Sequence, residues 1–314
     1  MLMKKIDPSI ISGIVRRAVL DSFAANLVNG IPFDEPQRLF ASPEANALKE
    51  EIVRAGRKLW ERQYVDGNGG NISVRLSPHH VLCTPTLCSK ADLRVEDLSL
   101  VDLDNCQICG DRPQTSEILL HLEIYKAVPD AKAVIHCHPP YATAHAVAGV
   151  IPQGNLIPEQ EVFVGPVALA PYETPGTQVF AETVLPYVKN HNTILLANHG
   201  IVCWADTVTH AEWYVEVVET YCKTIMIAGQ LRPKLNEIPA EKIQDLLALK
   251  KRLGLPDPRL PAEADVTEAS ELSGHSAAES QRKSAGRNRP GKDEINAFVS
   301  RWTAEVVAFL NGSE

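Results

Sequence analysis

Ala133-Val-Ile-His-Cys-His-Pro-Pro140 is the stretch that decides the fold and places the chemistry. Two β-branched residues open the run and two prolines close it, which predicts a buried strand that ends at a loop. Because side chains alternate along a strand, His136 and His138 point to the same face, close enough to share one metal ion, and Cys137 faces away. A histidine pair alone is equally compatible with hydrogen-bonded core residues.

A second strand-like run, Thr193-Ile-Leu-Leu-Ala-Asn-His-Gly200, also ends in a histidine at a glycine turn. Three histidines that leave a fourth position open are a common way to hold a catalytic zinc ion. We therefore interpret His136, His138 and His199 as candidate metal ligands.

Glu117 stands at the start of a helix predicted over residues 118–126, with Ser116 as its N-cap. A glutamate in the first turn of a helix usually complements the helix dipole. Here the helix leads through a proline–aspartate pair into the strand that carries His136 and His138. This connection can bring Glu117 near the metal.

Composition bounds the class of protein. The chain has 314 residues, 45% of them hydrophobic, which is enough for a substantial core. A net charge of −8 argues against a nucleic-acid or anionic-membrane partner. No apolar run is long enough to span a bilayer, and charged residues interrupt any signal-peptide core. Seven scattered cysteines indicate reduced thiols, so we expect a cytoplasmic protein.

Apolar periodicity divides the chain into elements. Helices are predicted over residues 8–29, 43–64, 118–126, 141–148, 177–189, 207–229 and 239–253, and strands over residues 72–76, 100–103 and 167–170. The predicted organisation is an N-terminal helical extension (1–42), a main domain (43–254), a linker (255–292) and a C-terminal helix (293–314). The linker has almost no large apolar residue, so we expect it to be disordered.

A glycine-rich turn, Asp66-Gly-Asn-Gly-Gly-Asn-Ile-Ser73, runs into the first predicted strand. Its glycines allow a ligand to approach backbone amides, so an anion can bind here. A tight turn before a strand is the simpler interpretation. A hydroxyl-rich loop further along the chain ends in Ser89 and Lys90.

Six short motifs occur in a fixed order over residues 45–232. They are Gly70-Asn-Ile-Ser73, Thr84-Pro-Thr86, Ser116-Glu117, His136-Cys-His-Pro139, Ala170-Pro-Tyr172 with Gly176-Thr177, and Asn198-His-Gly200. In their order and spacing the chain resembles the class II aldolase/adducin family, which has the fold of L-fuculose-1-phosphate aldolase. The resemblance implies an α/β fold: a three-layer α/β/α sandwich around a mostly antiparallel sheet. It also implies a homo-oligomer, commonly a tetramer, with active sites where subunits meet.

By this resemblance His136, His138 and His199 would bind Zn²⁺, and Glu117 would move a proton at the carbon next to the substrate carbonyl. The physical chemistry agrees, because a divalent ion on the carbonyl oxygen stabilises an enediolate and a neighbouring carboxylate exchanges the proton. Three imidazoles and a carboxylate would also accept another divalent metal.

The family's phosphate pocket uses the glycine–asparagine turn, the Thr-Pro-Thr loop and the hydroxyls just before the glutamate. Leu87 replaces the glycine expected after that loop, and a leucine would crowd an anion at this position. Ser89 and Lys90 can supply compensating donors. The candidate substrate-binding residues are Gly70, Asn71, Thr86, Ser89, Lys90 and Ser116.

The fuculose enzyme also uses a tyrosine after the histidine strand to protonate an alkoxide. Residues 158–165 of this chain contain Glu159, Gln160 and Glu161 but no tyrosine. Either Glu161 or a tyrosine elsewhere is the second acid, or the reaction is not that aldol cleavage.

The leading hypothesis is a zinc-dependent aldehyde-lyase of carbohydrate metabolism. It would cleave a C–C bond in a hydroxylated carbonyl compound, by retro-aldol reaction on a sugar or sugar phosphate. The alternative on the same scaffold is a decarboxylase, dehydratase or epimerase, favoured by Leu87 and the missing tyrosine. A non-catalytic, adducin-like interaction module is the third hypothesis, but such a module has no chemical reason to keep the histidine set.

Overall fold

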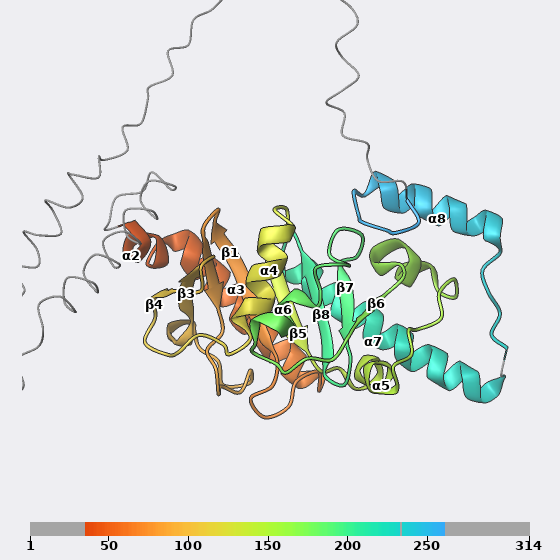
Figure 1. Cartoon of the computed structure of the whole chain (residues 1–314), viewed down its shortest axis with the longest axis horizontal. Helices are drawn as coiled ribbons and strands as arrows, with labels where there is room; N and C mark the ends of the chain where they lie inside the picture. Colours follow the sequence, from red (N-terminus) through yellow and green to blue (C-terminus); the bar gives the residue numbers. More distant parts are fainter. Residues whose placement is uncertain (1–34, 233, 261–314) are drawn as a thin grey trace, which may run out of the picture. The chain divides into compact units, whose positions relative to one another are not determined.

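One mixed sheet organises the described chain. The computed structural model describes residues 35–232 and 234–260. Eight strands in these residues lie in the order β4-β3-β2-β1-β5-β8-β7-β6 (Figure 1). They are β1 (Asn71–Ser77), β2 (His80–Cys83), β3 (Ser99–Asp102), β4 (Gln107–Cys109), β5 (Ala133–Cys137), β6 (Ala168–Ala170), β7 (Thr193–Leu196) and β8 (Gly200–Ala205). Every neighbouring pair is antiparallel except β6 and β7, which confirms the predicted mostly antiparallel sheet.

Helices cover both faces of this sheet. They are α2 (Glu35–Phe40), α3 (Pro43–Glu61), α4 (Ile118–Ala127), α5 (Pro140–Ala148), α6 (Gln178–Glu182), α7 (Val208–Leu231) and α8 (Ala240–Arg252), with a 3₁₀ turn (Val95–Asp97) and a π-helical turn (Gln160–Val164). One apolar core joins α3, α5 and α7 to one face of the sheet, and a second core joins α4 and α6 to the other face. The three-layer α/β/α fold predicted from the sequence is therefore confirmed.

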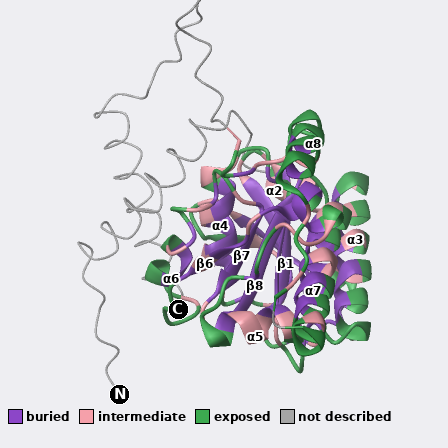
Figure 2. Cartoon of the chain, turned by 90° about the vertical axis from the view of Figure 1, so that its right-hand side faces the viewer, coloured by how far each residue is buried: buried purple, intermediate pink, exposed green. Residues whose placement is uncertain are grey.

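The central strand β5 separates the two cores by simple alternation. Ile135 and Cys137 belong to the core beneath α3 and α7, and Val134 belongs to the core beneath α4. All five residues of β5 are buried, and its sheet neighbours β1 and β8 are drawn largely in the colour of buried residues in Figure 2. His136 therefore lies on the α4 face, with Cys137 on the opposite face, as the period of two predicts.

The strand registers bring the site residues together. β1 pairs with β5 so that Asn71 lies opposite His136. β5 pairs with β8 so that His136 lies opposite Val202, two residues beyond Gly200. The turn before Gly200 therefore reaches the end of β5, where both histidines of the first motif lie.

Two predicted elements differ from the structure. The helix predicted over residues 177–189 ends at Glu182, and turns continue from there to residue 190. The run predicted as one strand ending at Gly200 is the first half of a hairpin, because β8 starts at Gly200 and pairs back along β7. The extended, β-branched residues after Gly200 satisfy their backbone groups on both β5 and β7.

The predicted N-terminal helix over residues 8–29, most of the linker and the C-terminal helix lie outside the described residues. The chain from 255 to 260, which the sequence places in the linker, is described and includes a buried aspartate, Asp257. None of the described helices is long and apolar enough to cross a membrane.

Candidate active site

Three histidines converge where β5 ends and the β7–β8 turn begins. The Nε2 atoms of His136 and His138 are 3.1 Å apart, and the ring centroid of His199 lies 4.6 Å from that of His136 and 5.1 Å from that of His138. One ligand atom from each ring falls within 4.8 Å of the others. This spacing suits a single ion bound through three nitrogens, which take metal–nitrogen distances of about 2.0–2.1 Å for zinc.

His136 has its ring fixed by the backbone. Its Nδ1 lies 2.9 Å from the carbonyl oxygen of Ile201, so Nδ1–H donates and Nε2 is left as the lone-pair nitrogen at the cluster. Burial lowers the pKa of His136 well below its usual value, and the nearby His138 and His199 lower it further. Neutral imidazole is the form that binds metals.

Glu117 faces the histidines from the start of α4. One carboxylate oxygen, Oε2, lies 3.4 Å from His136 Nε2, and the other, Oε1, lies 3.5 Å from His199 Nε2. Asn71 Nδ2 donates to Oε2 at 2.7 Å, whereas Oε1 is buried and accepts no hydrogen bond in the described structure. Glu117 itself holds the N-cap position, so the predicted cap at Ser116 is wrong by one residue.

The donor set fits a divalent metal ion. His199 Nδ1 and Glu117 Oε1 are buried polar atoms without a hydrogen-bond partner among the described residues, and both belong to this cluster. Buried polar atoms normally have partners, so unsatisfied ones beside three convergent imidazoles indicate a place for a ligand. His136, His138 and His199 would hold the ion, with Glu117 beside it.

A chain of buried polar side chains, which was not predicted from the sequence, continues behind Glu117. Asn71 Oδ1 lies 2.5 Å from His121 Nε2, and His121 Nδ1 lies 2.7 Å from Ser73 Oγ. Ser73 Oγ lies 2.9 Å from the hydroxyl of Tyr125. The signal was present as spacing, because Glu117, His121 and Tyr125 recur every fourth residue on α4 and so share one helix face.

The predicted substrate-binding residues lie at this end of the sheet, all on loops except Asn71, which begins β1. Lys90 is buried and its Nζ donates to the carbonyl oxygens of Cys88 at 2.8 Å and Asn68 at 3.3 Å, which ties its loop to the glycine-rich turn. Burial lowers the pKa of Lys90 to about 8, against the opposing effect of Glu117. Gly70 has φ +69° and a Cβ there would lie 2.9 Å from the carbonyl oxygen of His136, so the turn packs directly against β5.

The remaining candidates are less closely tied to the triad. Thr86 N donates to the carbonyl oxygen of Pro113, ahead of α4. Ser89 Oγ accepts from Ala91 N at 3.2 Å, and Ser116 is exposed beside Glu117. The Asn71 side chain, expected to contact an anion, instead links Glu117 and His121.

Leu87, the residue in place of the family glycine, has a left-handed backbone. Its φ is +51° and its side chain is 75% exposed. A glycine adopts this conformation freely, whereas a leucine pays about 1–2 kcal/mol for it. The loop at Leu87 therefore has the backbone conformation that suits the glycine expected there, although the residue is leucine.

Glu161, one of the two suggested second acids, has a different environment. Its Oε2 lies 2.7 Å from Arg259 Nη1, and its Oε1 accepts from Asn155 N at 2.6 Å. Arg259 also pairs with Asp257, which contacts Lys250 at 3.1 Å. Glu161 is thus committed to an ion-pair cluster that includes none of the three histidines.

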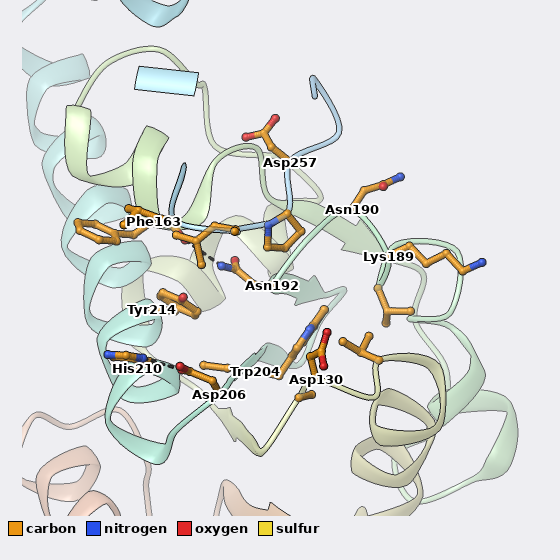
Figure 3. A pocket seen from close by; sticks show the side chains of 18 of the residues that line it. Asp130, Phe163, Lys189, Asn190, Asn192, Trp204, Asp206, His210, Tyr214 and Asp257 are labelled. Carbon is orange, nitrogen blue, oxygen red and sulfur yellow. Dashed lines mark hydrogen bonds and ion pairs between the residues drawn. The ribbon is translucent and has the colours of Figure 1, made fainter. Parts of the chain in front are cut away.

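A cavity lined by residues of the described chain lies at the other end of the strands (Figure 3). It has a volume of about 790 Å³, and Phe163, Trp204 and Tyr214 line it together with His210, which is paired with Asp206. These residues adjoin the start of β5 and the end of β8, the ends opposite those that carry the histidines. This cavity is therefore separate from the candidate metal site.

Known proteins resemble this chain over the same region. The family model described as Class II Aldolase and Adducin N-terminal domain matches residues 50–226. The 3-oxo-tetronate 4-phosphate decarboxylase of Haemophilus influenzae is 35% identical over 205 residues, which are 64% of this chain and 96% of that protein. An L-fuculose phosphate aldolase of Methanococcus maripaludis is 35% identical over 181 residues, 58% of this chain and 97% of that protein.

A solved structure of L-fuculose 1-phosphate aldolase superposes with a TM-score of 0.60 at 27% identity, covering 66% of this chain and 96% of that one. The matched family region, residues 50–226, contains Glu117 and all three histidines. The sequence, the sheet order and these matches agree. The chain therefore belongs to the class II aldolase and adducin family.

Proposed function

We propose that this protein is a metal-dependent decarboxylase of a phosphorylated β-keto sugar acid. The observation that carries the proposal is Glu117, a carboxylate with one free buried oxygen beside three histidines. The relatives named 3-oxo-tetronate 4-phosphate decarboxylase supply the substrate class, because a 3-oxo acid has its carbonyl β to the carboxylate. The aldolase reaction that led the sequence-based hypotheses becomes the second candidate.

The absence of a tyrosine in residues 158–165 supports decarboxylation over aldol cleavage. When a β-keto acid loses CO₂, the electron pair of the broken C–C bond passes into an enolate, and only one proton must then be added, at carbon. Glu117, ionised at rest, can take up a proton from solvent on Oε1 and pass it to that carbon, which returns the carboxylate to its ionised form. Glu161, in the segment that lacks a tyrosine, is ion-paired with Arg259 and takes no part.

A bound divalent ion would polarise the substrate carbonyl and stabilise the enolate charge. His136, His138 and His199 would hold that ion, and we propose zinc because three imidazoles with an open position are its common catalytic donor set. Lys90, with the neighbouring hydroxyl-bearing loops, would bind the substrate phosphate. We extend the proposal to a homotetramer, as the family resemblance implies, and to the cytoplasm, as the seven scattered cysteines indicate.

The test is to offer the purified, metal-loaded chain 3-oxo-tetronate 4-phosphate and L-fuculose 1-phosphate in parallel, following CO₂ and aldehyde release. We expect CO₂ from the first substrate, and a fall in kcat of about 10²–10⁴-fold in Glu117→Gln. Glu123→Gln, on the same helix and paired only with groups away from the triad, is the matched control and should keep its activity. Aldehyde release without CO₂ would instead establish the aldolase reading.

That second candidate rests on the aldolase relatives and on the shared fold. Aldol cleavage needs a group that takes a proton from the substrate hydroxyl as well as one that protonates carbon. Glu117 supplies one of these groups, so this reading requires a further residue that the described site does not identify.

A further inference from the structure

We propose that His121 is a positioning residue of this site, holding the Asn71 amide so that its NH₂ group faces Glu117. Only the predicted effect on kcat rests on the proposed function. In the structure, this role of His121 means that every hydrogen bond in the chain of side chains behind Glu117 has one fixed direction from donor to acceptor. This chain runs from Tyr125 through Ser73, His121 and Asn71.

The order follows from what each group can donate. An ionised Glu117 carboxylate only accepts, so Asn71 must present Nδ2–H to Oε2, as the 2.7 Å contact has it. The amide oxygen then faces His121 Nε2 at 2.5 Å, and because this oxygen only accepts, Nε2 carries the hydrogen.

The directions of the other hydrogen bonds in the chain follow in the same way. A neutral imidazole has one donor nitrogen, so His121 Nδ1 accepts and Ser73 donates to it at 2.7 Å. Ser73 Oγ, having given its only hydrogen, accepts from the Tyr125 hydroxyl at 2.9 Å, which is shorter than the 3.5 Å contact of that hydroxyl with the Lys132 carbonyl. Every hydrogen therefore points toward Glu117.

Burial keeps His121 in the neutral form that this order needs. Ser73 and His121 are completely buried, and Tyr125 and Asn71 are 1% and 4% exposed. Burial lowers the pKa of His121 to about 3, with His136 adding to the effect and Glu117 opposing it. Burial likewise raises the pKa of Tyr125, so the hydroxyl stays protonated.

The fold supplies this chain from two elements in contact. Asn71 and Ser73 are two residues apart on β1 and share a face, and Glu117, His121 and Tyr125 are each four apart along α4. This arrangement determines which carboxylate oxygen of Glu117 is available. Oε2 is occupied by Asn71, and Oε1 stays free beside His199.

Without His121, the Asn71 amide loses the donor that fixes its orientation and can turn its oxygen toward Glu117. Two acceptors would then face each other, and the carboxylate would move away from its position at the histidines. A disturbance of this kind lowers kcat and leaves the substrate-binding loops, and hence KM, unchanged.

The first test observes the proton order directly. Long-range ¹H–¹⁵N spectra of the full chain, labelled with ¹⁵N in histidine, report which ring nitrogen carries hydrogen. We expect His121 as the Nε2–H tautomer, assigned by its loss in His121→Gln. The Nδ1–H tautomer would overturn the proposal, because the amide would then be reversed. This measurement needs no turnover, so it stands even if the proposed decarboxylation fails.

The second test compares two substitutions by kinetics. Glutamine keeps a donor and an acceptor, whereas leucine has neither. We expect His121→Leu to lower kcat at least tenfold with KM and bound metal unchanged, and His121→Gln to restore most of the loss. His80→Leu is the matched control, since His80 is buried on β2 and its ring hydrogen-bonds Ser77. Equal kcat in both His121 variants would overturn the positioning role.

Discussion

His136 and His138 are held by different local constraints. His136 is completely buried and bonded to the Ile201 carbonyl. His138 follows β5 and has Asp66 Oδ1 3.7 Å from its Nδ1. A Cβ at Gly200 would meet the ring of His138 at 2.7 Å, so the glycine lets the two turns approach each other. The ligand set therefore depends on the close packing of two loops as well as on the histidines themselves.

Metal content tests the triad one residue at a time. We expect the wild-type chain to retain near-stoichiometric zinc by elemental analysis and His138→Ala to lose it, since two imidazoles bind far more weakly than three. His138 is partly exposed, so its truncation should leave the fold intact. His210→Ala removes a partly exposed histidine at the other end of the strands and should keep the metal. Metal-free wild-type protein after zinc is offered would contradict the site.

The low pKa of Lys90 gives a second prediction at this scale. Because burial brings the pKa to about 8, the ammonium is charged below that pH and neutral above it. If Lys90 binds the substrate phosphate, KM should rise as pH increases through 8, by up to about tenfold per pH unit. Initial-rate measurements from pH 6.5 to 9.5 test this.

Lys90→Met should give a high KM that no longer changes over this range. Lys126→Met, a control on the exposed face of α4, should keep the wild-type profile. A KM that stays constant with pH in the wild type would remove Lys90 from the phosphate site.

The sequence predicted the residues at the site better than their contacts. The period of two placed His136 and His138 on one face, and the structure has them there. It did not predict that Asn71 bonds Glu117 and His121, because that depends on the register of β1 against β5 and on the packing of α4. The spacing of residues along a helix or strand predicts which side chains share one face. Which residues that face contacts depends on the packing of the elements.

At the scale of elements, the turns between strands position the residues of the site. The β7–β8 hairpin turns through Asn198, which has φ +56°, a conformation that asparagine tolerates better than most residues. This turn carries His199 to the end of β5. The sequence predicts a turn at Gly200 but not the returning strand, because a short apolar run after a glycine is compatible with several structures.

The Leu87 loop offers a prediction about element stability. Leu87→Gly should raise the free energy of unfolding by up to about 1 kcal/mol, since relief of the left-handed leucine exceeds the entropy that a glycine adds to the unfolded chain. Urea denaturation measures the change. Leu253→Gly is the comparison, because Leu253 is half exposed at φ −81°, and it should destabilise the chain. A loss of stability in Leu87→Gly would show that the exposed leucine makes contacts that outweigh the strain.

At the scale of the whole described chain, a segment beyond the matched family region is fixed to it by charge. Helix α8 and residues 253–260 follow residue 226, where the family match ends. Lys250 and Asp257 in this segment meet Arg259 and Glu161, and Glu161 belongs to the family region. Gly165, directly after the π-helical turn, has φ +78°, and a Cβ there would also meet Lys250 Nζ and Asp257 Oδ2, so glycine suits this position. The composition of the chain predicts a linker from residue 255. Composition carries no information about ion pairs, so it does not predict that residues 255–260 are attached to the domain.

The last prediction concerns this attachment. Both side chains of the Lys250–Asp257 pair are completely buried, and Arg259 holds Asp257 through two nitrogens at 2.8 Å each. Asp257→Asn should cost about 3–5 kcal/mol of unfolding free energy, because it leaves a buried ammonium without its counter-charge. Lys250→Met should cost less, since Asp257 keeps Arg259. In the double variant the second change should cost less than it does alone, as expected for residues in one network. Urea denaturation of the four proteins gives these values, and equal losses in the two single variants would show that the cluster does not hold the segment through Asp257.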